Sequence, residues 1–203
     1  MGKEKPVIYF MDGVDTKEEK KWRHAIEHCF EGLDLEDRCY IPPIYVYNTL
    51  IQAISDTYDP AHPFCDKLLD QFAKSHVWAF AFIQDEHLRN PKYSEEEIHR
   101  ICLCSNRILP TRGLSPETII YHEMSHFLTF FRDNIPLDST NEDYVEARCN
   151  AMSLQLFGKM LNKFPNYKPL KKGKTIDDFN KTIKQFVDTF DLDELMEVLN
   201  GTN

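Results

Sequence analysis

Two histidines one helical turn apart, with a glutamate beside the first, carry the clearest chemistry in this sequence. They lie in the stretch TIIYHEMSHFLTFF (residues 118–131), where His122, Glu123 and His126 form an HExxH motif. On a helix, imidazoles at positions i and i+4 project to the same side and can bind one zinc ion about 2 Å away. Glu123 projects beside them, where it can hold a zinc-bound water. The motif therefore predicts a zinc site that activates water.

A third protein ligand is expected from the next helical segment, because such sites use three. The stretch DYVEARCNAMSLQLFGKMLN (143–162) has helical periodicity, and Glu146 falls near the middle of its apolar arc. A buried carboxylate is costly unless it is neutralised, and a divalent cation would neutralise it. We therefore expect Glu146 to be buried and to bind the metal. A buried ion pair with an arginine is the alternative, and Glu142 is the substitute ligand if the helix begins elsewhere.

Asn150 follows Glu146 by one helical turn and lies on the same side of the predicted helix. Zinc-binding histidines commonly donate their second ring N–H to an outer partner, which fixes the tautomer. We predict that the Asn150 side chain accepts this hydrogen bond. The alternative is an ordinary hydrogen bond between Asn150 and the backbone.

The elements that must position these residues mix strands and helices before residue 115 and are helical after it. Strands are predicted over 6–13, 42–48, 77–84 and 99–109, and helices over 16–33, 64–75, 115–132, 143–162, 175–189 and 192–199. This order predicts an α+β fold: a small mixed sheet, an active-site helix and a helical C-terminal part. The length fits one domain, 1–203, with the sheet portion over 1–114 and the helical portion over 115–203.

Composition narrows the choice of partners and compartment. A formal net charge of −9 argues against nucleic acid as a partner, since phosphate binding requires clustered Lys and Arg. No apolar run reaches the ~18 residues of a membrane span, and the N-terminal residues do not form a signal peptide. The six cysteines are scattered and form no CxxC pair, which favours reduced thiols, although a metal or redox role for Cys102 and Cys104 is the alternative. We expect a cytoplasmic protein with no membrane partner.

The order HExxH, then Glu146 twenty residues later, then Asn150, resembles the gluzincin class of zinc metallopeptidases. The likeness is greatest to the ImmA/IrrE-type peptidases. Their strand, loop, HExxH helix and following helix correspond here to ICLCSNRI, LPTRGLS, TIIYHEMSHFL and EARCNAMS. The resemblance covers roughly residues 100 to 162. It departs from the family where Ser125 replaces a usual glycine and where Met152 and Ser153 replace a usual Phe-Ala.

This resemblance implies a zincin-like fold and hydrolysis of a protein or peptide substrate, with Zn²⁺ held by His122, His126 and Glu146. Glu123 would be the general base. Tyr144 is the first candidate for the donor that stabilises the oxyanion. The other candidates by sequence position are Tyr121, His99 and Arg148.

In zincins, the strand before the active helix commonly binds substrate as an added strand, which here would be 100–108 or its neighbour 77–84. Two other functions remain open at this point. One is a catalytically idle zincin-fold protein-interaction module with a structural zinc. The other is a zinc hydrolase of a non-peptide amide.

Overall fold

A four-stranded mixed sheet forms the centre of the protein, which confirms the expected α+β class. The computed structural model describes residues 4–74, 77–83, 88–94, 99–108, 115–136 and 141–170, so the helices predicted over 175–189 and 192–199 lie outside the described residues. The strand order is β1-β2-β4-β3. The first three strands in that order run parallel, and β3 is antiparallel to β4. Their bounds are β1 Ile8–Phe10, β2 Ile44–Tyr47, β3 Ala79–Phe82 and β4 Arg100–Cys104.

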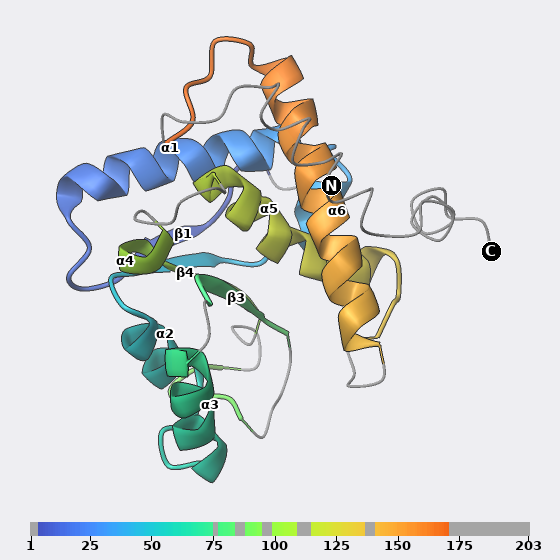
Figure 1. Cartoon of the computed structure of the whole chain (residues 1–203). Coiled ribbons are helices and arrows are strands. Elements are labelled where there is room, and N and C mark those ends of the chain that lie inside the picture. The colour runs from blue at the N-terminus through green and yellow to red at the C-terminus, as the bar shows by residue number, and fades with distance from the viewer. Residues whose placement is uncertain are drawn as a thin grey trace.

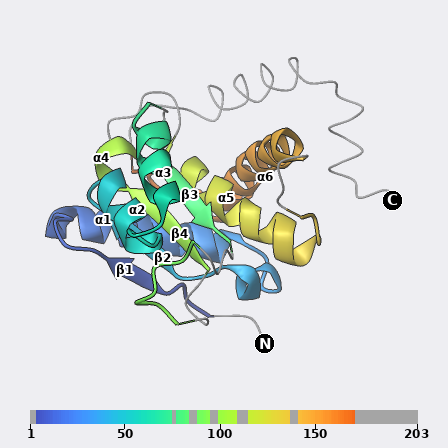
Figure 2. The same ribbon diagram turned by 90° about the horizontal axis from the view of Figure 1, so that it is seen from below.

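Helices cover both faces of this sheet (Figure 1). On one face lie α1 (Thr16–Gly32) and α5 (Pro116–Phe127), and on the other lie α2 (Leu50–Thr57) and α3 (Pro63–Lys74), as Figure 2 also shows. The long helix α6 (Glu142–Lys163) packs against α5 more extensively than any other pair of described elements does. The remaining short helices are η1 (Asp37–Tyr40), α4 (Ser105–Ile108) and the π-helical turn η3 (Leu128–Arg132). None of the described helices is long and apolar enough to cross a membrane.

Alternation along the central strands divides the interior into two cores. Ile44, Val46, Ile101 and Leu103 face α1 and α5. On the opposite face, Tyr45, Tyr47, Cys102 and Cys104 pack with α2 and α3. Because helices cover both faces, neither side of these strands needs polar residues. Cys102 and Cys104 are buried free thiols in the second core.

Two details differ from the sequence prediction. The strand predicted over 99–109 ends at Cys104, and the chain continues as α4. Ser105 anchors this change of direction, since its hydroxyl accepts from Trp22 Nε1 at 3.1 Å and donates to Glu18 at 2.8 Å. The helix α2 was not predicted, although Thr49 and Gln52 form a capping box at its start.

The last residue of α1 lies where three helices meet. Tyr121 of α5 donates its hydroxyl hydrogen to the Cys29 carbonyl at 2.9 Å, beside Gly32. A Cβ added at Gly32 would collide with that hydroxyl and would lie 3.1 Å from Met160 Cβ of α6. The missing side chain at position 32 therefore allows α1, α5 and α6 to approach closely.

We expect Gly32→Ala to lower the free energy of unfolding by about 1–3 kcal/mol, because overpacking outweighs the gain in helix propensity. The measurement is urea unfolding of both proteins. Repeating the substitution in a Tyr121→Phe background, where the hydroxyl is absent, should reduce this loss. An equal loss in both backgrounds would show that the collision is not its cause.

A polar cluster fastens the far face of the sheet. The Asp56 carboxylate of α2 accepts hydrogen bonds from Tyr47 and Tyr93, each at 2.6 Å, and pairs with Lys92 and with Arg100. Burial alone would raise the pKa of Asp56, but the hydrogen bonds from Lys92, Tyr47 and Tyr93 outweigh it and lower the pKa below its ordinary value. The cluster thus joins α2, β2, β4 and residues 88–94.

We expect Asp56→Asn to cost about 1–3 kcal/mol at neutral pH, the usual contribution of hydrogen bonds to a charged group. Because the folded pKa is lowered, the stability from ionised Asp56 is present above the unfolded pKa of about 3.9 and is lost as pH falls through the folded value. Urea unfolding at a series of pH values should show that the difference in free energy of unfolding between wild type and Asp56→Asn becomes smaller below about pH 4. A difference in free energy of unfolding that stays constant from pH 7 to pH 3 would show that ionised Asp56 is not the source of this stability.

Candidate metal centre

The helix that carries the HExxH motif begins where the sequence indicated. Ser115 caps α5, with its hydroxyl accepting from the Thr118 amide at 3.2 Å, and Pro116 occupies the first turn. The core-facing residues of α5 are fully buried, among them Ile120, Met124 and Phe127. This anchoring turns the opposite side of the helix, with His122 and His126, toward α6.

Two imidazoles from α5 and one carboxylate from α6 meet at a common point. The Nε2 atoms of His122 and His126 are 3.2 Å apart. The carboxylate of Glu146 places one oxygen 3.3 Å from Nε2 of His122 and the other 3.4 Å from Nε2 of His126. Ligands about 2.0–2.1 Å from a tetrahedral zinc are separated by about 3.3 Å, so these spacings fit the ion. Among the described residues, these three form the one group of His, Cys, Asp or Glu side chains arranged to hold a metal.

The expectation that Glu146 is buried was wrong. Its side chain is 49% exposed, whereas the neighbouring Val145 and Cys149 are buried against the core. Val145 and Cys149 mark the side of α6 that faces the core, and Glu146 lies at the edge of that side. There its carboxylate faces the two histidines of α5. The burial argument therefore fails, although the same residue meets both histidines. Its binding of zinc stays a prediction.

The charges at this centre favour a cation. Burial opposes a charge on His122, but the hydrogen bond with Glu146 and the negative charges of Glu123 and Glu146 raise its pKa above the ordinary value. Burial, together with the charge of His122, lowers the pKa of His126 to about 4. The hydrogen bond with His122 is the largest influence on Glu146 and lowers its pKa. Glu146 therefore favours positive charge at the point where the three side chains meet.

Glu123 is buried beside the triad and faces the edge of the sheet. Burial is the main reason that the pKa of Glu123 rises to about 7, and the negative charge of Glu146 also raises it. The charge of His122 and a hydrogen bond from the Ala81 backbone act in the opposite direction. The amide of Cys104 donates to the Trp78 carbonyl at 3.1 Å. In an antiparallel pair only every second residue exchanges hydrogen bonds with the neighbouring strand, so Ala81, three residues after Trp78, does not bond to β4. Its backbone N–H and C=O therefore point away from β4, toward the outer edge of the sheet. Glu123 therefore lies at the outer edge of β3.

Asn150, predicted as the outer partner of a ligating histidine, lies near His122, and its side chain contributes to the raised pKa of that ring. By distance and angle the buried Nδ1 of His122 has no hydrogen-bond partner among the described residues, so the role of Asn150 stays a prediction. Cys149, which the sequence analysis did not select, has its Sγ 3.5 Å from Nδ1 of His126. Because Cys149 lies three residues after Glu146 on the same side of the helix, the sequence could have indicated that it lies close to a ligating histidine. Burial raises the pKa of the Cys149 thiol to about 12, so it is neutral.

An ion-pair network fixes α6 relative to the end of α5. Asp133 follows η3 and accepts from Arg148 of α6 at 2.6 Å and from Arg132 at 2.7 Å. Arg132 also pairs with the buried Asp37 of η1 at 3.2 Å. Arg148, one of the candidates for the oxyanion donor, is thus part of the connection between α5 and α6.

The other candidate donors receive little support. Tyr144 is 41% exposed, and it lies two residues before Glu146, about 160° away around α6. The catalytic role predicted for Tyr144 stays a prediction. Tyr121 is fully buried with its hydroxyl bonded to Cys29, and His99 packs against Phe131 with ring centroids 4.9 Å apart.

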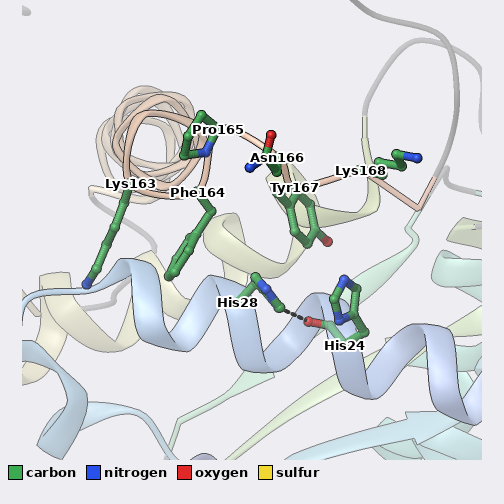
Figure 3. Close-up of a pocket in the computed structure, with 8 residues that line it drawn as sticks. All are labelled: His24, His28, Lys163, Phe164, Pro165, Asn166, Tyr167 and Lys168. Atoms are coloured by element: carbon green, nitrogen blue, oxygen red, sulfur yellow. Dashed lines mark hydrogen bonds between the residues drawn. The ribbon is translucent and has the colours of Figure 1, made fainter.

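A separate pocket lies between α1 and the chain that follows α6 (Figure 3). It has a volume of about 450 Å³ and is lined by His24, His28, Lys163, Phe164, Pro165, Asn166, Tyr167 and Lys168, so it includes none of the triad. The Tyr167 ring packs on both histidine rings, and its hydroxyl donates to the buried Glu117 of α5 at 2.7 Å. This segment therefore holds the start of the helix that carries the two candidate ligands.

A scan against protein-family models found no match, and neither the search of curated proteins nor the search of solved structures found one. The chemistry assigned to this centre is therefore argued from its own residues.

We expect Glu146→Ala to weaken zinc binding far more than Glu142→Ala does, although the two acids lie one turn apart on α6. Only Glu146 contacts the histidines, whereas Glu142 is exposed in the first turn. The measurement is zinc content after dialysis, by elemental analysis, with His122→Ala as a second test of the triad. If Glu142→Ala loses zinc and Glu146→Ala keeps it, the ligand assignment is wrong.

Proposed function

We propose that this chain is a zinc-dependent metallopeptidase of the gluzincin class with a zincin-like fold, most like the ImmA/IrrE-type peptidases. The observation that carries the proposal is the set of three spacings, 3.2, 3.3 and 3.4 Å, that joins His122, His126 and Glu146. A buried carboxyl group, Glu123, stands directly beside them. The HExxH motif supplies three of these four residues.

In the proposed reaction, Glu123 moves the proton. His122, His126 and Glu146 would hold a zinc ion, which would act as a Lewis acid on the scissile carbonyl and lower the pKa of a water toward ~7. The carboxylate of Glu123 accepts a proton from the attacking water and donates it to the leaving amine. Burial raises the pKa of Glu123 to about 7 in the metal-free protein, and the charge of a bound zinc ion would lower it and favour the carboxylate that acts as the base. The hydrogen bond from the Ala81 backbone holds this carboxyl at the edge of β3.

A peptide is the proposed substrate because an edge strand adjoins the proton-transfer group. Between the two predicted substrate strands, β4 has β2 and β3 as neighbours, whereas β3 ends the strand order of the described sheet. Backbone groups of Ala79 and Ala81 point outward from that edge, with Glu123 beside them. An extended peptide can add there as a further strand, which brings its backbone carbonyls to the centre. A small amide would gain nothing from this edge.

We expect Glu123→Gln to lower kcat for peptide cleavage by about 10²- to 10⁴-fold, the usual contribution of a general base, while zinc content stays at the wild-type level. The measurement pairs turnover of a peptide library, read by mass spectrometry, with elemental analysis. The amide keeps the size of the side chain but cannot accept the proton.

Removing zinc with a chelator should also abolish cleavage, and adding zinc back should restore it. Wild-type cleavage by the Glu123→Gln protein would refute the mechanism. Stoichiometric zinc without cleavage of any peptide would favour the interaction module, and cleavage of small amides alone would favour the non-peptide hydrolase.

A further inference from the structure

The ring of His126 is held between two residues of α6. Its Nε2 faces Glu146 at 3.4 Å, and its Nδ1 lies 3.5 Å from Sγ of Cys149. Glu146 and Cys149 are three residues apart, so they are neighbours on one side of the helix. A single turn of α6 therefore contacts both nitrogen atoms of the ring, one on the metal side and one behind it.

The atoms behind the ring are arranged to receive a hydrogen bond. A histidine that binds a metal through Nε2 carries its hydrogen on Nδ1, and an acceptor there fixes both tautomer and orientation. Thr129 Oγ1 lies 3.8 Å from Sγ of Cys149, and both residues are fully buried. The thiol can thus donate its own hydrogen to Thr129 and accept the ring N–H of His126 on sulfur.

The π-helical turn η3 brings Thr129 to this position directly after the HExxH helix. Its carbonyl accepts from the Ile135 amide at 3.1 Å, which ties the turn to the chain that leaves it. The two rings differ in their outer neighbours: Cys149 lies behind His126, whereas Asn150 is the neighbour of His122. One ligand ring is therefore oriented from behind by a thiol.

We propose that Cys149 is a positioning residue that fixes the tautomer and ring orientation of His126 for zinc binding, an inference that rests on the proposed zinc site. The usual partners of such a ring are a carboxylate or a carbonyl oxygen. Here the sulfur of Cys149 takes that place, with Thr129 on its other side. Thr129 completes the arrangement by holding the thiol.

The chain offers a matched control in its second core. Cys102 is also fully buried, and its Sγ lies 3.4 Å from Thr57 Oγ1. Cys149→Ala and Cys102→Ala therefore each remove a buried thiol beside a threonine, but only Cys149 is paired with a histidine. Zinc affinity is measured by competition with a chromophoric chelator. We expect Cys149→Ala to bind zinc about 10- to 100-fold more weakly than wild type, the usual effect of losing an outer partner, and Cys102→Ala to bind as wild type.

A second readout needs no metal. In the zinc-free protein, ¹⁵N NMR of the imidazoles should show His126 with its hydrogen on Nδ1 in the wild type and in Cys149→Ser, whose hydroxyl can also accept. Cys149→Ala should show a mixture of the two tautomers. Cys149→Val, which also removes the acceptor but fills more of the space, provides the test if the alanine variant fails to fold.

The possible results separate this inference from the proposed function. Unchanged zinc affinity and an unchanged tautomer in Cys149→Ala would overturn the role of Cys149 while leaving the metallopeptidase intact. An equal loss of zinc in Cys102→Ala would overturn it as well, since the effect would then be general destabilisation. If the wild type binds no zinc, the proposed function falls, and the tautomer of His126 still decides whether the thiol orients the ring.

Discussion

The packing of α6 on α5 is the constraint on which the rest of the structure depends. Two candidate ligands lie on α5 and the third on α6, and their spacings of 3.2 to 3.4 Å leave little tolerance. A shift of ~1 Å between the helices would open the group beyond the reach of a single ion. The pairing of Arg148 with Asp133, the close approach at Gly32 and the thiol behind His126 all act on this one contact.

The electrostatics of the centre follow from placing charges where water is largely excluded. Two imidazoles whose Nε2 atoms are 3.2 Å apart cannot both be protonated at low cost. Against the effect of burial, Glu146 and Glu123 raise the pKa of His122, whereas burial and the charge of His122 lower the pKa of His126. Glu123 lies deeper, and burial moves its pKa up to about 7. Two carboxyl groups close to the same histidines thus have pKa values that shift in opposite directions. The pKa of the half-exposed Glu146 is lowered, and the pKa of the buried Glu123 is raised. Such divergence of neighbouring acids is typical of catalytic centres.

The sheet supplies none of the candidate metal ligands, but it fixes the position of the helix that carries two of them. Its central strands are buried on both faces, which fixes α5 on one side, while α2 and the Asp56 cluster fasten the other side. The antiparallel strand β3 stands at the border of the described sheet and directs alternate backbone groups toward Glu123. The sheet thereby places Glu123, the proposed general base, beside the strand edge proposed to bind the substrate.

The sequence by itself determined the helices that carry the candidate ligands and the identities of the paired histidines. Periodicity and capping residues predicted α1, α5 and α6 to within a few residues, because these signals are local: a Ser-Pro start and apolar residues at helical spacing. The HExxH spacing needs only a helix to bring His122 and His126 together. The sequence also identified Glu146, yet for a reason that was wrong, since its side chain is half exposed.

Only the tertiary structure decided how the helices face one another, and with that the surroundings of each ring. Whether Asn150 or Cys149 lies behind a histidine depends on the rotation of α6 about its axis, and a turn of one residue, about 100°, exchanges such positions. The rotation is set by the core contacts of Val145 and Met160, the Arg148 pair and the close approach at Gly32, which join residues far apart in the chain. The position of β3 at the sheet border is likewise a property of strand order. Local patterns carry no information on such long-range choices, because many rotations and strand orders satisfy the same periodicity.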